Sequence, residues 1–132
     1  MKPTVLVVDD EPSIRETIEI VIEDYYKVVS AANGKEALDI IECTKVDAVL
    51  LDIIMPDMDG LEVLEKIKEA EPGAEVIMVT ATKSIETAVQ SIKLGAYDYI
   101  TKPFDKDNLL AVLKRALEKR ELSRETLFLK EE

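Results

Sequence analysis

Short apolar runs alternate along the chain with longer stretches in which apolar residues recur every three or four positions. The short runs are rich in β-branched residues and cover residues 5–8, 27–31, 48–51, 76–79 and 97–100. Four of them are apolar almost throughout, which is typical of strands buried on both faces of a parallel sheet. The pattern therefore predicts five strands.

The longer stretches predict amphipathic helices, because their apolar residues fall on one helical face. The stripes are Ile14, Ile18, Val21, Ile22 and Tyr25; Ala37, Ile40 and Ile41; Leu61, Leu64 and Ile67; and Ile85, Ala88, Val89 and Ile92. Pro12 and Ser84 suit helix starts, Gly34 opens the second helix, and Gly73 and Gly95 follow the third and fourth. Strict alternation predicts a single α/β domain, a doubly wound (βα)5 fold with right-handed crossovers.

The fifth helix is predicted to begin near residues 105–108, and its apolar stripe thins after Leu117. Beyond that point the apolar residues lie scattered among charges: Leu122, Leu127, Phe128 and Leu129. We divide the chain into a domain of residues 1–120 and a helical extension of residues 121–132. The extension is either a linker or dimerisation helix that needs a partner, or a frayed end.

Composition excludes several classes of function. The 132 residues include 28 acidic and 17 basic side chains, and the net charge of −11 disfavours direct binding to nucleic acid or an anionic membrane. The absence of histidine excludes a histidine phosphocarrier, a Ser/His triad and histidine-ligated zinc in this chain. Without a secretory signal or membrane span, and with Cys43 as the one cysteine, a cytoplasmic location is predicted.

Polar side chains follow the predicted strands. Asp9 and Asp10 follow the first strand, Asp52 the third, Thr80 the fourth and Lys102 the fifth. Because carboxyl ends of parallel strands share one edge, these groups are expected to converge there. Taken alone, Asp9 and Asp10 are explained equally well as helix-capping acids; taken together with the other groups, they favour a site.

Three converging carboxylates need a compensating cation, since each like-charge pair at ~4 Å costs about 4 kcal/mol at an effective dielectric of ~20. Oxygen ligands without His or Cys favour Mg²⁺, with Mn²⁺ possible. A carboxylate can attack phosphorus while a metal ion and a lysine neutralise the phosphoryl oxygens. The residue set therefore suits phosphoryl transfer to an aspartate.

Four runs in this order, VLVVDDEPSIRE, LLDIIMPDMDGLEVL, VIMVTA and GAYDYITKPF, resemble the receiver domain of bacterial two-component response regulators. The resemblance covers about residues 1–120 and implies a flavodoxin-like (CheY-like) sheet in the order 2-1-3-4-5. Such a domain is a regulatory phosphoacceptor rather than an enzyme acting on a separate substrate.

The resemblance also implies a role for each site residue. Asp52 would accept the phosphoryl group from a sensor histidine kinase. Mg²⁺ would be held by Asp10, Asp52 and the Ile54 carbonyl, with Asp9 acting through water. Lys102 would contact the phosphoryl group and the Asp52 carboxylate.

Thr80 and Tyr99 match the switch pair of the family, in which the hydroxyl moves to the phosphoryl group and the ring turns inward. The residues alone predict only a half-buried strand aromatic at Tyr99. The implied output surface is the fourth helix, fifth strand and fifth helix, through which a homodimer could form together with the tail. The bond from Lys102 to Pro103 is commonly cis in such domains.

Several neighbours have structural interpretations. Gly60 is expected to permit a positive φ in the MPDMDG loop, and Asp57 and Asp59 are expected to be loop or capping acids. Cys43 is expected to be packed or semi-exposed and unreactive. The apolar Ile54 cannot orient attacking water, which predicts slow dephosphorylation.

Three functions of the chain remain open from the sequence alone. The chain most resembles receivers of the nitrogen-regulator type, in which a helix leads to an AAA+ ATPase output domain serving sigma-54 transcription. It is either a segment of such a regulator or a single-domain regulator that acts by protein contact or in a phosphorelay. A haloacid-dehalogenase-like phosphatase is remote, because its nucleophile lies in a DxD motif after the first strand, where this chain has Asp9, Asp10 and Glu11.

Overall fold

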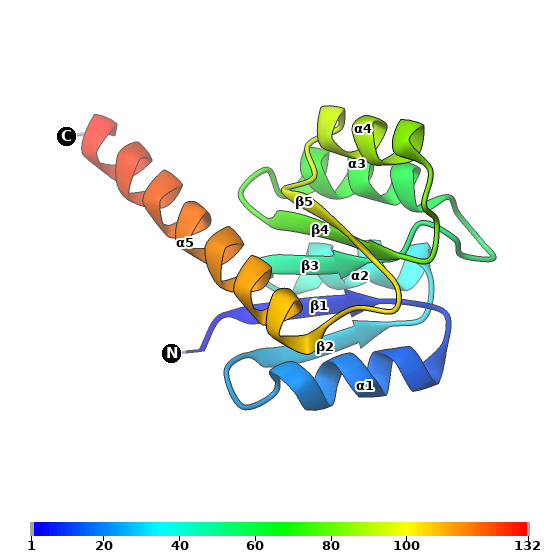
Figure 1. The fold of residues 1–132 in the computed structure, drawn as a ribbon. Helices are drawn as coiled ribbons and strands as arrows, with labels where there is room; N and C mark the ends of the chain where they lie inside the picture. The colour runs from blue at the N-terminus through cyan, green and yellow to red at the C-terminus, as the bar shows by residue number, and fades with distance from the viewer. Residues whose placement is uncertain (1, 132) are drawn as a thin grey trace.

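The computed structural model describes residues 2–131, with side chains described for residues 2–121. Five strands alternate with five helices: β1 (Thr4–Val8), α1 (Pro12–Ile22), β2 (Lys27–Ala31), α2 (Gly34–Cys43), β3 (Ala48–Leu51), α3 (Gly60–Ala70), β4 (Glu75–Thr80), α4 (Ile85–Lys93), β5 (Asp98–Thr101) and α5 (Lys106–Glu131). All neighbouring strands are parallel, in the order β2-β1-β3-β4-β5 (Figure 1). The predicted fold is confirmed.

Two hydrophobic cores cover the two faces of the sheet, because successive side chains of a strand point to opposite faces. Val5 and Val7 of β1 pack with α1 and α5, in a core that includes Ile18 and Leu113. The alternate positions of β1 pack with α2 and α3 in the other core. The three central strands are therefore apolar on both faces, as their sequences predict.

Three strands differ from the prediction by one residue at one or both ends. β1 begins at Thr4 rather than at residue 5, β4 runs from Glu75 to Thr80 rather than over 76–79, and β5 runs from Asp98 to Thr101 rather than over 97–100. The register explains the carboxyl ends of β4 and β5, since Thr80 lies opposite Thr101 and the parallel ladder continues to this pair. The polar groups still lie at the carboxyl edge of the sheet.

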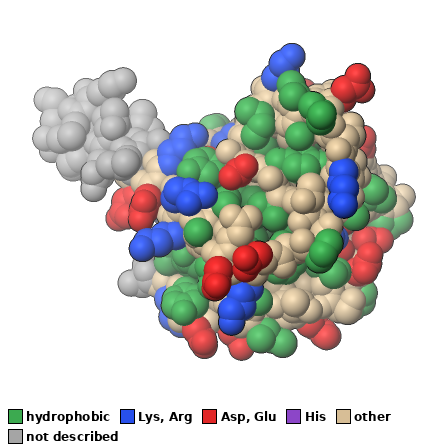
Figure 2. All heavy atoms as spheres, in the orientation of Figure 1, with side chains coloured by type: hydrophobic (Ala, Val, Ile, Leu, Met, Phe, Trp, Pro, Cys, Tyr) green, Lys and Arg blue, Asp and Glu red, His purple; other side chains and the backbone are tan. Residues whose placement is uncertain are grey.

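The large apolar residues of α4 face away from the core. Ile85, Val89 and Ile92 are 81%, 47% and 49% exposed, and green side chains lie over α4 at the top of the molecule in Figure 2. The fully buried residue of this helix is Ser91, whose hydroxyl donates to the Thr87 carbonyl at 2.9 Å. Small polar residues thus face the sheet, and the apolar stripe faces outward.

Helix α5 extends beyond the sheet (Figure 1), and two ion pairs tie it to the amino edge. The Arg120 Nε lies 2.8 Å from Asp47 Oδ1, and the Lys119 Nζ lies 3.5 Å from Glu75 Oε2. The apolar side chains of residues 122–129 lie outside those described, so the division at residue 120 and the dimerisation role of the extension stay predictions. None of the helices in residues 2–131 is both long and apolar enough to cross a membrane.

Candidate functional site

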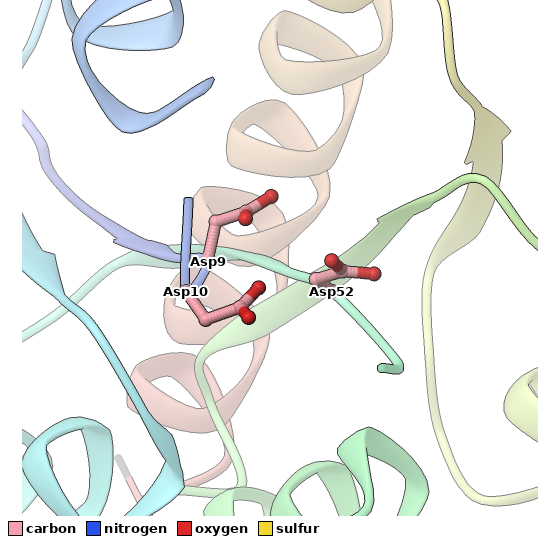
Figure 3. Close-up of side chains that lie close together, drawn as sticks. All are labelled: Asp9, Asp10 and Asp52. Atoms are coloured by element: carbon pink, nitrogen blue, oxygen red, sulfur yellow. The ribbon is translucent and has the colours of Figure 1, made fainter. Parts of the chain in front are cut away.

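Three carboxylates meet at the carboxyl edge of the sheet. Asp9 and Asp10 follow β1 and Asp52 follows the neighbouring β3, with carboxylate oxygens within 4.8 Å of one another (Figure 3). Asp9 and Asp52 are buried, whereas Asp10 is exposed. The convergence predicted from the sequence is therefore present, with one member of the cluster open to solvent.

Lys102 reaches the same cluster from the end of β5. Its Nζ lies 2.6 Å from Asp9 Oδ2 and 3.2 Å from Asp52 Oδ2. Partial burial works to lower the pKa of Lys102, but the hydrogen bond to Asp9 and the charges of Asp52 and Asp9 outweigh it, so this pKa lies above its ordinary value. The bond from Lys102 to Pro103 is cis, as the family resemblance implies.

Arg15 is a second cation beside the cluster, which the sequence alone did not predict. The carboxylate of Asp9 accepts the Glu11 N–H at 2.9 Å, which is the local turn that a strand-end aspartate commonly makes. From α1, Arg15 donates to the Asp9 carbonyl oxygen at 2.6 Å. Asp9 therefore forms a strand-end turn and also belongs to the cluster, whereas it does not cap α1, whose start after Glu11 has no side-chain cap. A lone arginine in the first turns of α1, six residues past Asp9, is the signal that could have found this contact.

The loop after β3 folds back onto its own start. The Gly60 N–H donates to the Ile53 carbonyl at 2.8 Å, and a Cβ at Gly60 would lie 2.3 Å from the Asp52 carbonyl oxygen. The expected positive φ at Gly60 is wrong, since Gly95 is the residue with positive φ among those described. Glycine is required at position 60 by this close approach instead. Ile54 projects outward and is 62% exposed.

The two acids of this loop cap different helices. Asp59 accepts the Leu61 N–H at 2.9 Å and caps α3, the helix that follows it. Asp57 accepts the N–H groups of Gly34 and Lys35, each at 3.1 Å, at the start of α2. These backbone hydrogen bonds, the one from Gly34 first, hold the pKa of the Asp57 carboxyl below its usual value. The predicted capping roles are confirmed, although the helix that Asp57 caps is distant in sequence.

The predicted switch pair, Thr80 and Tyr99, is connected through the backbone of one residue, Thr82. The Thr82 N–H donates to Thr80 Oγ1 at 3.3 Å, and the Tyr99 hydroxyl donates to the Thr82 carbonyl at 2.7 Å. Thr80 is fully buried, while Tyr99 is half-buried and packs against a hydrophobic core. Burial and the charge of Asp52 raise the pKa of the Tyr99 hydroxyl, which favours its neutral, donating form.

The donor set fits a hard divalent cation. The side chains of the cluster offer carboxylate oxygens, which suit Mg²⁺ and Mn²⁺ better than softer metals. Three carboxylates against the ammonium of Lys102 and the guanidinium of Arg15, which binds the Asp9 carbonyl, leave an excess of one negative charge, which a bound cation would offset. Asp10 and Asp52 are the side chains best suited to hold it, because the Asp9 oxygens accept shorter hydrogen bonds, from Lys102 at 2.6 Å and the Glu11 N–H at 2.9 Å, than the Asp52 oxygens do, from Lys102 at 3.2 Å and the Ile54 N–H at 3.4 Å.

The parallel α/β fold with a cluster of acids and a lysine at the carboxyl edge of its sheet indicates a class of regulatory domains, and comparison with known proteins identifies the family. The model of the response regulator receiver domain matches residues 5–114. The chain belongs to this family of two-component response regulator domains.

Similar proteins include larger regulators. The chain is 47% identical over 129 residues to a response regulator of Rickettsia bellii described as NtrX-like, covering 96% of this chain and 27% of that protein. It is 41% identical over 114 residues to the transcriptional regulatory protein ZraR of Escherichia coli, covering 86% and 26%. A crystal structure of NtrX from Brucella abortus superposes with a TM-score of 0.91 at 39% identity, covering 98% and 30%. The chain thus spans a quarter to a third of the length of these proteins.

Proposed function

We propose that the chain is a phosphorylation-controlled switch in which Asp52 accepts a phosphoryl group from a sensor histidine kinase. The observation that carries this proposal is the position of Asp52, which lies buried at a strand end beside two further acids and 3.2 Å from Lys102. Asp52 suits the nucleophile better than Asp9, because its oxygens accept longer hydrogen bonds, from Lys102 at 3.2 Å and from the Ile54 N–H at 3.4 Å. The Asp9 carboxylate is held more closely, by Lys102 at 2.6 Å and by the Glu11 N–H at 2.9 Å.

The proposed transfer is a substitution at phosphorus. A carboxylate oxygen of Asp52 forms the new P–O bond while the P–N bond to the imidazole of the kinase breaks, and that nitrogen takes up a proton. Mg²⁺, held by Asp10, Asp52 and the Ile54 carbonyl, with Asp9 acting through water, would neutralise charge on the phosphoryl oxygens; Mn²⁺ could take its place. Lys102 stabilises the same charge from the β5 side and remains paired with the acids before and after transfer.

The phosphoryl signal would then be read by Thr80 and Tyr99. A new acceptor on Asp52 competes for the Thr80 hydroxyl, which lies at the end of the neighbouring strand β4. Because Thr82 bonds to both Thr80 and Tyr99, movement of Thr80 is transmitted through the β4–α4 loop to the aromatic ring. The apolar stripe of α4, exposed next to this loop, is the surface whose presentation would change, together with β5 and α5.

The proposed setting is the cytoplasm, and the proposed output is control of transcription of the sigma-54 activator type. Support comes from similarity to regulators described as NtrX-like and as ZraR, both of which are much longer than this chain. The net charge of −11 argues against direct DNA binding by this segment. An output domain joined to α5 would supply the contact with DNA, and a homodimer through α4, α5 and the extension would bring two such domains together.

The decisive experiment is phosphorylation with a small acyl phosphate or amidophosphate in the presence of Mg²⁺, followed by intact mass measurement. Wild type should gain one phosphoryl mass, and Asp52→Asn should gain none. Asp59→Asn, which changes a nearby aspartate that lies outside the cluster and caps α3, is the matched control and should still be phosphorylated. A phosphoryl gain that persists in Asp52→Asn, or none in wild type with Mg²⁺ present, overturns the assignment.

A further inference from the structure

The loop between β3 and α3 carries the Ile54 carbonyl and is held at both ends. At its start, the Asp52 N–H donates to the Val8 carbonyl at 3.1 Å, and at its end the Gly60 N–H donates to the Ile53 carbonyl at 2.8 Å. Among the described residues, the hydrogen bonds that join positions 54–58 to another helix or strand are the two accepted by Asp57. Asp57 therefore ties the tip of this loop to the rest of the domain.

The start of α2 depends on these two hydrogen bonds to Asp57. Of the first N–H groups of α2, those of Gly34 and Lys35 donate to the two oxygens of Asp57, each at 3.1 Å. The next two N–H groups along α2 donate to the side chain and carbonyl of Asn33, at 2.9 and 3.1 Å. The second of these bonds, from the Ala37 N–H, is the first regular bond of the helix, so Asp57 caps two of the three preceding N–H groups, those of Gly34, Lys35 and Glu36. The helix begins 23 residues before Asp57, and the charge of this carboxylate suits the positive end of the helix dipole.

Packing at the same place confirms that the loop and α2 are in close contact. A Cβ added to Gly34 would lie 2.8 Å from Val63 Cγ2 and 3.1 Å from Met58 Cβ. The absence of a side chain at Gly34 lets the loop tip approach the backbone of α2. Hydrogen bonding and packing together hold the tip from the α2 side.

We propose that Asp57 is a positioning residue of the metal site. By tying residues 54–58 to α2, its two-oxygen cap holds the Ile54 carbonyl where an ion on Asp10 and Asp52 can reach it. The inference rests on the proposed function, which places Mg²⁺ on these groups. Loss of partners that orient metal ligands commonly weakens metal binding ten- to a hundredfold, so the loss of this tie should be measurable as metal affinity.

The test is calorimetric titration of the whole chain with Mg²⁺, without any phosphoryl donor. Asp57→Ala should raise the Kd for Mg²⁺ by about tenfold. Asp59→Ala is the matched control, because it removes a capping aspartate of the same loop whose bond stays within α3, and it should leave the Kd within about twofold of wild type. Asp57→Asn keeps one carbonyl acceptor and should give an intermediate Kd. Exchange of the Gly34 and Lys35 amide hydrogens should quicken in Asp57→Ala alone.

The outcomes separate this inference from the proposed function. A wild-type Kd in Asp57→Ala, or an equal rise in both alanine variants, would overturn the positioning role while leaving the Mg²⁺ site intact. Failure of folded wild type to bind Mg²⁺ would overturn the metal site itself, and with it this inference. If circular dichroism shows that Asp57→Ala is unfolded, Asp57→Asn decides the question, since a Kd equal to that of wild type would overturn the role.

Discussion

The ion pair between Arg120 and Asp47 should contribute to stability in a way that a double-mutant cycle can measure. Arg120 is 5% exposed, and its Nε lies 2.8 Å from Asp47 Oδ1. The other oxygen of Asp47 accepts the Thr4 N–H at 2.9 Å, so the carboxylate joins the starts of β1 and β3 to α5. This cluster lies at the amino edge of the sheet, opposite the acidic site.

The magnitude follows from distance and burial. At 2.8 Å and an effective dielectric of ~20, the two charges attract by about 6 kcal/mol, most of which desolvation offsets. Removing one partner of a buried pair costs roughly 3–5 kcal/mol because the other charge stays buried and unpaired. The Asp47 side chain is 17% exposed, so we expect the lower end, about 3 kcal/mol, for Arg120→Met.

The assay is urea unfolding at neutral pH, followed by circular dichroism, of wild type, Arg120→Met, Asp47→Asn and the double variant. Methionine keeps the aliphatic bulk of the arginine, and asparagine keeps an acceptor for Thr4. We expect a coupling energy of about 2 kcal/mol, and a melting temperature of Arg120→Met roughly 10 °C below wild type. A coupling energy below about 0.5 kcal/mol, the value of an exposed pair, would refute the reasoning.

Three further outcomes are expected. Lys102→Met should slow phosphoryl uptake from a small donor at least tenfold at saturating Mg²⁺, because a positioned cation is lost; an unchanged rate in a mass-detected time course would remove Lys102 from the mechanism. Ile54→Asn should shorten the half-life of the phosphorylated protein, since an amide can orient attacking water, and an equal half-life would contradict this. The lowered pKa of Asp57 gives stability that is present above about pH 4 and lost as the pH falls through its folded value, so wild type should lose more stability on acidification than Asp57→Ala. Parallel curves of unfolding free energy between pH 6 and pH 2 would show that the cap contributes nothing.

The local sequence was sufficient to predict the strands and helices, and to predict that the site lies at the carboxyl edge of the sheet. A strand buried on both faces must be apolar throughout, so β1, β3 and β4 are visible from composition alone. Parallel strands place their carboxyl ends together, so Asp9, Asp10, Asp52 and Lys102 could be assigned to one site before any coordinates. Both inferences depend on covalent geometry and on alternation along the chain, which sequence records directly.

The tertiary structure decided which partner each group takes. The period of α4 shows that Ile85, Val89 and Ile92 share a face, but only the folded domain, in which Ser91 is buried and these three residues are exposed, shows that this face points outward. In the same way, the sequence predicts that an acid in a loop caps a helix, but not which helix. Asp57 caps α2 rather than α3 because the fold brings it beside Gly34, 23 residues earlier in the chain. Periodicity and turn chemistry are local properties of the chain. The pairing of Lys102 with Asp9, like the direction that α4 faces, is set by contacts between residues far apart in sequence, and these exist only in the folded domain.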